Sequence, residues 1–207
     1  MHSWASPISV VLGLIIVLSA PDTRSRIATI IFVLSVVTMF TVSASFHRRQ
    51  WSDLGWWRMR QLDMTAIYLL IAGSYTGIVE PVMSEPWRTR LLLAVWLGAA
   101  AGIVIRWLPI VPPFGLTTAI YVVVGSVLIP ALDELHEGVG TTGVVLILGG
   151  CLLYLFGALM LGARWPNPRP GVFGYHEVWH IWVTIAAFMH YAVSYFVVLP
   201  RAAELAG

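Results

Sequence analysis

The sequence lacks lysine, has a single cysteine and carries few charged residues for its length. Of its 207 residues, 58% are hydrophobic and 11% are charged, whereas about 25% of a soluble domain is charged. Such a composition leaves too little polar surface to cover a water-soluble globule. Because Cys151 is the only cysteine, an internal disulfide and a cysteine-rich zinc cluster are excluded. The twelve arginines are scattered between apolar runs, so we expect no nucleic-acid partner.

Long apolar runs are what the sequence has in abundance. A membrane-spanning helix needs about 20 mostly apolar residues, and suitable runs occur seven times. We therefore predict an all-α membrane protein whose single domain, residues 1–207, is a seven-transmembrane helix bundle. The predicted spans are approximately 4–20, 27–47, 63–79, 90–108, 114–132, 141–162 and 176–199.

The arginines predict the orientation of this bundle. With seven spans, the N-terminal side carries seven arginines and the opposite side carries five. Basic residues are enriched on the cytoplasmic side of membrane proteins, so we predict a cytoplasmic N-terminus. Trp51, Trp56 and Trp57 stand among arginines in residues 48–62, which predicts a segment lying in the membrane interface.

Ionisable residues within the predicted spans lie at particular span ends. His47 closes the second span, Asp63 opens the third, and His176 and His180 open the seventh. Following the chain back and forth places these three ends on the same side of the membrane. Ionisable side chains in spans are costly and usually functional, so we expect a site where these ends meet.

The spacing of His176 and His180 predicts a metal site there. Residues four apart share one face of a helix, so two imidazoles can bind one ion. With His47 they would hold Zn²⁺ and leave a fourth position for water, as in catalytic zinc sites. Asp63 would orient or deprotonate that water. Ser43, one turn before His47, would hydrogen-bond to a ligand or the substrate.

Residues 176–180 also match H-E-x-x-H, the metalloprotease pattern in which the glutamate is the general base. That pattern needs a third ligand downstream, where only His190 and Glu204 are available. His190 is about 21 Å further along the helix, so the protease is the weaker alternative and a hydrogen-bonded role in the bundle is expected for His190. Glu177, His190 and His2 are accessory candidates, the last because the first span starts on the same side.

These motifs resemble the hemolysin III branch of the progestin and adipoQ receptor family. The Ser-x-x-x-His motif of that bacterial branch is similar to residues 43–47. Its Leu-Asp-x-x-Ala-Ile-Tyr and Gly-Ser-Tyr-Thr motifs are similar to residues 62–68 and 73–76, and its His-x-x-x-His motif to residues 176–180. The resemblance covers almost the whole chain. It implies seven helices in a bacterial cell membrane, a cytoplasmic N-terminus, zinc bound by three histidines and a water between zinc and Asp63.

The resemblance also implies kinship to membrane ceramidases, which cleave lipid amides. We therefore expect a zinc-dependent hydrolase whose partners are membrane lipids, with a ceramide-like or fatty-acyl substrate. The alternative is a non-enzymatic protein, either a sensor of membrane lipids or a cytolytic, pore-forming protein, in which zinc only joins two spans. No span carries a continuous polar stripe, which offers little for a pore. The sequence leaves the substrate and the oligomeric state open.

Overall fold

A computed structural model describes residues 2–109, 115–169 and 171–206, without the side chains of residues 2 and 3. This part of the chain is a bundle of helices and contains no β-strand. The α-helices are α1 (His2–Leu18), α2 (Thr23–Arg48), α3 (Asp53–Val82), α4 (Trp87–Trp107), α5 (Leu116–Gly125), α6 (Leu132–Ala163), α7 (Tyr175–Val193) and α8 (Leu199–Ala206). A 3₁₀-helix, η1 (Ile129–Ala131), precedes α6, and a π-helix, η2 (Ser194–Val198), joins α7 to α8.

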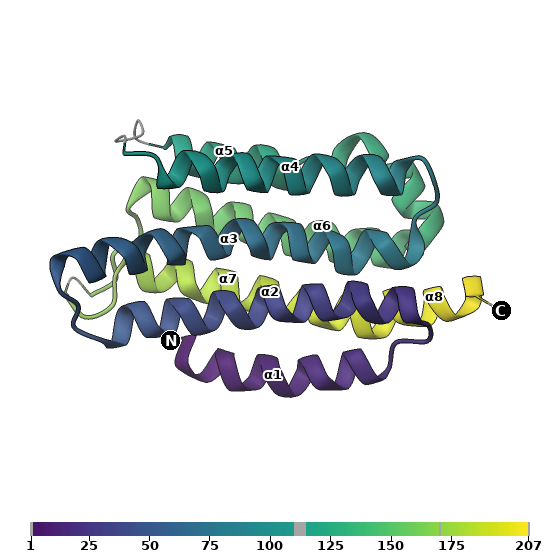
Figure 1. The fold of residues 1–207 in the computed structure, drawn as a ribbon, viewed down its shortest axis with the longest axis horizontal. Coiled ribbons are helices and arrows are strands. Elements are labelled where there is room, and N and C mark those ends of the chain that lie inside the picture. The colour runs from purple at the N-terminus through teal and green to yellow at the C-terminus, as the bar shows by residue number, and fades with distance from the viewer. Residues whose placement is uncertain (1, 110–114, 170, 207) are drawn as a thin grey trace.

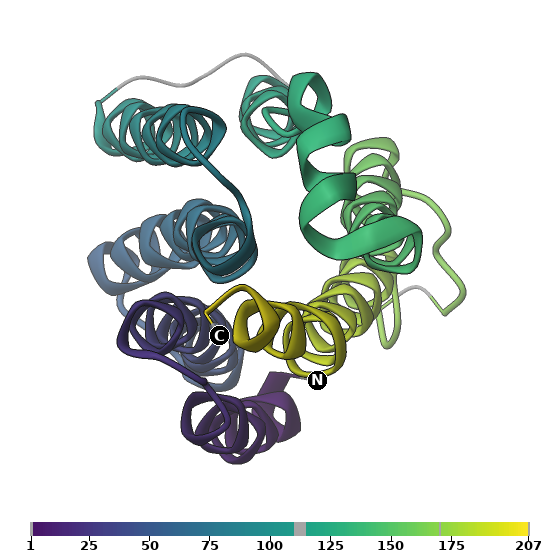
Figure 2. The same ribbon diagram turned by 90° about the vertical axis from the view of Figure 1, so that its right-hand side faces the viewer.

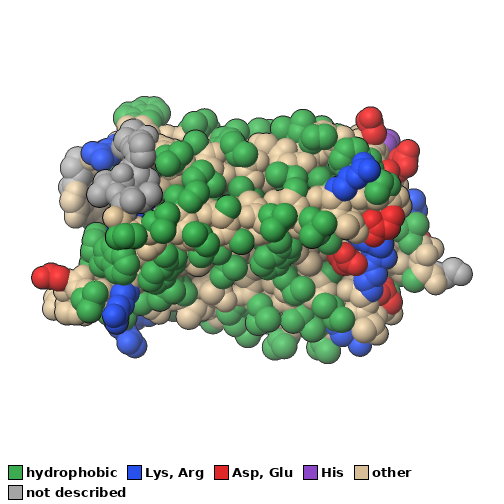
Figure 3. Space-filling view, turned by 45° about the horizontal axis from the view of Figure 1, so that its top comes forward, with side chains coloured by type: hydrophobic (Ala, Val, Ile, Leu, Met, Phe, Trp, Pro, Cys, Tyr) green, Lys and Arg blue, Asp and Glu red, His purple; other side chains and the backbone are tan. Residues whose placement is uncertain are grey.

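The composition of these helices suits a membrane. Five helical stretches are long and apolar enough to cross one: Thr23–Arg48, Asp53–Val82, Trp87–Trp107, Leu116–Ala163 and Tyr175–Ala206. The apolar helix at Trp4–Leu18 is shorter. Hydrophobic side chains cover the middle of the face in Figure 3, while charged side chains gather at its two ends. The multi-pass helical architecture is therefore confirmed, and the count of seven spans stays a prediction.

The helices run side by side along the long axis of the molecule (Figure 1). Helix α1 packs on α2 and α7, outside the main bundle (Figure 2). Small residues are fully buried where helices meet, including Ala72, Ala186 and Ala187. Small side chains let helix backbones approach closely, which is how bundles gain packing energy in lipid.

Polar caps decide where α2 and α3 begin. The Asp22 carboxylate accepts hydrogen bonds from the backbone N–H of Ser25 at 2.9 Å and from its hydroxyl at 2.6 Å. Ser52 accepts from the N–H of Gly55 at 3.3 Å and starts α3 at Asp53. Helix α3 is therefore longer than the predicted span at 63–79 and contains it, and the interfacial location of the residues before that span stays a prediction. Residues 53–62, with their arginines and tryptophans, are the first turns of α3, because a side-chain cap at Ser52 satisfies its first N–H groups.

The predicted fifth span, 114–132, is not one continuous helix. Residue 114 lies outside the described residues, α5 ends at Gly125, and η1 carries Pro130. The break leaves backbone groups without helical hydrogen-bond partners, and Tyr75 of α3 bonds to two of them. Its hydroxyl donates to Gly125 O at 2.7 Å and accepts from Leu128 N at 3.0 Å. Irregular backbone is tolerated inside a membrane only where such partners exist.

Two further irregularities shape the C-terminal half. Gly140, at φ 69° and ψ 176°, interrupts α6, so the predicted sixth span at 141–162 corresponds to the second part of that helix. The predicted seventh span, 176–199, corresponds to α7, η2 and the start of α8. Pro200 lacks the N–H that would bond one turn back, and the wider π-turns of η2 come just before it.

Candidate metal centre

Helix α2 presents the first candidate ligand in its last turn. His47 lies one residue before the end of α2, and its side chain is exposed. Trp51 Nε1 donates to Phe46 O at 3.2 Å, which holds the chain as it leaves the helix. The Phe46 ring packs beside the His47 ring, with centroids 4.8 Å apart. Sequence reasoning did not single out Phe46, and an aromatic residue directly before a histidine is too common a pattern to have found it.

Helix α7 presents the other two candidates in its first turns. The N–H of Gly174 donates to Glu177 Oε2 at 2.8 Å, and Val178 N donates to Gly174 O at 3.1 Å. These bonds start the helix at Tyr175. His176 then lies half-buried, and His180, one turn further in, is buried at 8% exposure.

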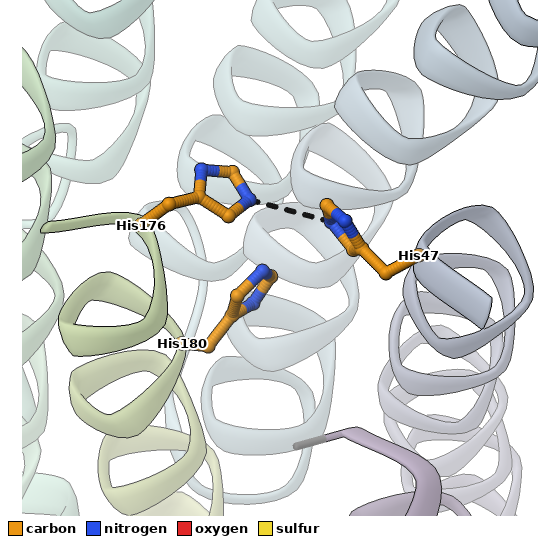
Figure 4. Close-up of side chains that lie close together, drawn as sticks. All are labelled: His47, His176 and His180. Carbon is orange, nitrogen blue, oxygen red and sulfur yellow. Dashed lines mark hydrogen bonds between the residues drawn. The ribbon is translucent and has the colours of Figure 1, made fainter. Parts of the chain in front are cut away.

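The three imidazoles point toward one another across the gap between α2 and α7 (Figure 4). The ring centroids are 5.0 Å apart for His47–His176, 5.1 Å for His47–His180 and 4.6 Å for His176–His180. Each residue offers a ring nitrogen, and these nitrogens all lie within 4.8 Å of one another. Nothing in the sequence spacing alone brings His47 to this place, because it comes from a different helix.

The dimensions of this cluster fit a metal ion. His47 Nε2 and His176 Nε2 are 3.3 Å apart. Two nitrogens bound to one tetrahedral zinc, each at about 2.05 Å, are also separated by about 3.3 Å. Three neutral imidazoles form a ligand set typical of zinc with one open position. His47, His176 and His180 can therefore hold a metal ion, and their burial increases from the exposed His47 to the buried His180.

Asp63 lies beside this cluster on α3. It is half-buried, ten residues after the start of the helix, and its carboxylate interacts electrostatically with His47 and Ser43. Ser43 is buried, and its hydroxyl has no hydrogen-bond partner among the described residues. The structure brings both predicted residues to the histidines.

Glu177 has a different position from the one that a metalloprotease needs. Its carboxylate turns back to the N–H of Gly174 and caps its own helix. A capping carboxylate stabilises the first turn and is occupied by that backbone bond. The third histidine of the cluster comes from α2 rather than from a downstream segment, which also departs from the H-E-x-x-H arrangement.

The remaining candidates lie apart from the three histidines or outside the described atoms. His190 is buried toward the other end of α7, where its Nε2 lies 3.4 Å from Ile147 O and its ring packs against Tyr154. A side chain on Gly150 would collide with that imidazole, so the glycine makes room for it. His2 begins α1 at the same end of the bundle as His47, but its side chain lies outside the described atoms.

Comparison with known proteins gives the same family as the motifs. Residues 1–191 match the family described as Haemolysin-III related. The chain is 29% identical to Hemolysin-3 of Bacillus cereus, over 97% of this chain and 90% of that protein. It is 28% identical to a Hemolysin-3 homolog of Bacillus subtilis (strain 168), over 74% and 68% of the two chains. It is 32% identical to Heptahelical transmembrane protein 4 of Arabidopsis thaliana, over 64% of this chain and 38% of that one.

These matches and the apolar helices agree on where the protein resides. The chain belongs to the haemolysin-III-related family and is a multi-pass protein of a bacterial-type cell membrane.

Proposed function

We propose that this protein is a zinc-dependent hydrolase of amide bonds in membrane lipids. The observation that carries the proposal is the cluster of three histidine nitrogens with the Asp63 carboxylate beside it. A hydrolase needs a group that can move a proton, and a carboxylate beside the metal ligands can do so.

Each residue of the site has a task in this proposal. His47, His176 and His180 hold the ion, which when bound supplies Lewis acidity and lowers the pKa of water. Asp63 accepts a proton from the attacking water and donates one to the leaving amine. Ser43, buried beside Asp63, restrains the carboxylate. Glu177 caps α7 and takes no part in the proton transfers.

The position of the site favours a lipid substrate. The three histidines lie where α2 ends and α7 begins, at one end of the apolar bundle (Figures 1 and 4). A lipid whose head group rests at that membrane face would present an amide bond at this depth. A ceramide-like or other fatty-acyl amide combines such a bond with an apolar tail, and we propose this class of substrate.

Metal content and lipid hydrolysis together test the proposal. We expect about one zinc per chain in the purified protein, as three histidine ligands imply, and release of fatty acid from acyl-amide lipids. His180→Ala should abolish both, and Asp63→Asn should keep the metal but lose hydrolysis. His136→Ala is the matched control, because this exposed histidine bonds to Thr141 far from the cluster. Hydrolysis that survives Asp63→Asn would contradict the proposed mechanism.

The competing hypothesis is a non-enzymatic protein in which zinc only joins α2 to α7. Its support is that the cluster bridges two helices, together with the name of the relative Hemolysin-3. Bound zinc without turnover of any acyl-amide lipid would favour this hypothesis, and a protein that releases dye from vesicles would favour its cytolytic form. If the protein hydrolysed a peptide substrate and Glu177→Gln abolished that activity, the metalloprotease hypothesis would be favoured instead.

The seven spans and the cytoplasmic N-terminus are part of the same proposal. Cys151 is the only cysteine, so a Cys151→Ser protein offers a clean background for labelling. Arg49 and Arg88 lie at opposite ends of the bundle. In intact cells, a membrane-impermeant thiol reagent should label R88C on the outer side and leave R49C, on the cytoplasmic side, unlabelled. The reverse pattern would place the histidine cluster on the outer face.

A further inference from the structure

A buried arginine near the end of α4 has no role in the site above. Arg106 is only 8% exposed, and its Nε and Nη2 atoms are buried without a hydrogen-bond partner among the described residues. A buried guanidinium that lacks acceptors has a large desolvation cost, and charged residues inside membrane proteins mark ligand or ion sites. An anion that binds there would remove this cost.

The two unpartnered atoms form one edge of the guanidinium. Nε–H and one Nη2–H point the same way and are spaced to meet two oxygens of one phosphate or carboxylate. This planar, paired geometry is the reason that arginine rather than lysine recognises oxyanions. The buried edge of Arg106 therefore has the chemistry of an oxyanion site.

The surroundings of Arg106 add positive charge and no carboxylate partner. Arg60 of α3 interacts electrostatically with Arg106, and neither forms an ion pair with a described residue. Tyr68 and Tyr121 both interact electrostatically with Arg106, and their rings pack together with centroids 4.5 Å apart. Tyr121 already donates its hydroxyl to Met64 O at 2.9 Å. Tyr121 also interacts electrostatically with Asp63, but no described carboxylate forms an ion pair with Arg60 or Arg106. Two neighbouring guanidinium groups favour a phosphate, which can carry more negative charge than a carboxylate.

The depth of the site points to a lipid as the source of that phosphate. Arg106 lies in the last turn of α4, at the same end of the bundle as His47. Trp107 beside it donates to Thr65 Oγ1 at 3.0 Å and packs edge-on against Trp57 at 5.8 Å. Tryptophans mark the level of lipid head groups.

We propose that Arg106, assisted by Arg60, binds the head-group phosphate of an anionic phospholipid at this end of the bundle. The site is separate from the three histidines, so the proposal does not depend on the hydrolase. Loss of zinc, as in His180→Ala, should leave lipid binding unchanged.

Binding of phosphatidic acid to the full chain in neutral detergent, measured by native mass spectrometry, tests the site. Arg106→Gln should weaken binding by about tenfold or more, which corresponds to about 1.4 kcal/mol. Arg106→Lys keeps the charge at the helix C-terminus but lacks the paired donors, so it should also weaken binding. Arg58→Gln, an exposed arginine at the same end, is the matched control and should change affinity by less than about twofold.

The sources of the oxyanion are separated by competition. Inorganic phosphate and oleate, at the concentration of phosphatidic acid, should displace little of the bound lipid. Equal competition by either would overturn the phospholipid assignment, and unchanged binding by Arg106→Gln would overturn the site. If Arg106→Gln does not fold, the wild-type protein decides: phosphatidic acid should raise its melting temperature more than phosphatidylcholine does, and an equal effect of both lipids overturns the proposal.

Discussion

The two ends of the bundle use their charges in different ways. At one end, where α1 joins α2 and α3 joins α4, arginines pair with glutamates of the same chain. These pairs are Arg24–Glu80 at 2.7 Å, Arg88–Glu85 at 2.6 Å and Arg201–Glu204 at 2.6 Å. We call this the ion-pair end. The histidine end holds His47, Asp63 and His176, together with Arg60 and Arg106, which have no carboxylate partner among the described residues.

This difference separates structural charges from functional ones. Charges that are satisfied within the chain stabilise helix ends and loops, and they need nothing from outside. A charged side chain that is buried without a partner among the described residues, such as Arg106, has a desolvation cost that a ligand can offset. We therefore expect changes at the histidine end to affect metal and lipid binding, and changes at the ion-pair end to affect stability.

The largest expected effect is at the histidine end. His180→Ala removes the most buried of the three ligands, and we expect zinc affinity to fall by more than about 100-fold, beyond the loss typical of residues that only support a ligand. Isothermal titration of the apoprotein with zinc measures this change. The metal-free variant should stay folded, with a loss of stability much smaller than its loss of zinc affinity. A large loss of metal-free stability would mean that His180 is a packing residue.

A matched pair of glycines extends the comparison to packing. A side-chain carbon on Gly138, at the ion-pair end, would lie 2.9 Å from the backbone oxygen of Val82, whereas one on Gly162, at the histidine end, meets nothing within 4 Å. Both substitutions to alanine gain the same helix propensity. Gly138→Ala should nevertheless lower the free energy of unfolding by about 1–3 kcal/mol, because the backbone of Val82 would have to shift to make room for the new methyl group. Thermal melts of both variants should show a loss for Gly138→Ala only.

Helix caps give a smaller effect that also depends on pH. Asp22→Ala should lower the free energy of unfolding by about 1 kcal/mol. The Ser25 hydroxyl and N–H hold the pKa of Asp22 below its ordinary value in the folded protein, so this stability is present at neutral pH. The stability contributed by this cap is lost as the pH falls from the ordinary pKa of aspartate through the lowered pKa of Asp22 in the folded protein.

The counterpart at the histidine end is the Ser52 cap, whose bond to Gly55 is longer at 3.3 Å. Ser52→Ala should cost less than Asp22→Ala and should show no acid dependence of its own. Chemical unfolding of both variants between neutral and acidic pH makes the comparison. Equal effects of the two variants at every pH would show that the two caps are equivalent.

The smallest effect is expected at the Arg24–Glu80 pair. Its side chains are 44% and 27% exposed, and exposed pairs contribute about 0.2–1 kcal/mol. Glu80→Gln should reduce stability by no more than this in low salt, and the difference should shrink in high salt. Melting temperatures at two salt concentrations measure it. A salt-independent loss would indicate that the Arg24 bond to the Glu80 carbonyl, rather than charge, matters most.

Some features of the fold could be predicted because they depend on composition. The helical membrane architecture follows from apolar runs that no soluble protein could bury. Helix boundaries were harder, because local contacts decide them. The cap at Ser52 starts α3 ten residues before the predicted span at 63–79, and the Tyr75 hydroxyl supports a break after Gly125 that a run of apolar residues conceals.

The candidate site could be predicted in part for a similar reason. His176 and His180 are neighbours on one helix face, so their partnership follows from spacing alone. That His47 joins them required the direction of each span. Arg106 contributed only to the charge count, since nothing in its neighbours along the chain indicates a buried, unpartnered edge.

The sequence by itself thus determined that this chain is a helical membrane protein of one family with histidines at matching helix ends. Only the tertiary structure decided that Glu177 caps α7, that His190 lies against Ile147 and Tyr154, and that Arg106 is buried without acceptors among the described residues. The physical reason is that periodicity and hydropathy act along one helix. Hydrogen-bond partners and burial depend on which helices meet, and those contacts join residues far apart in the chain.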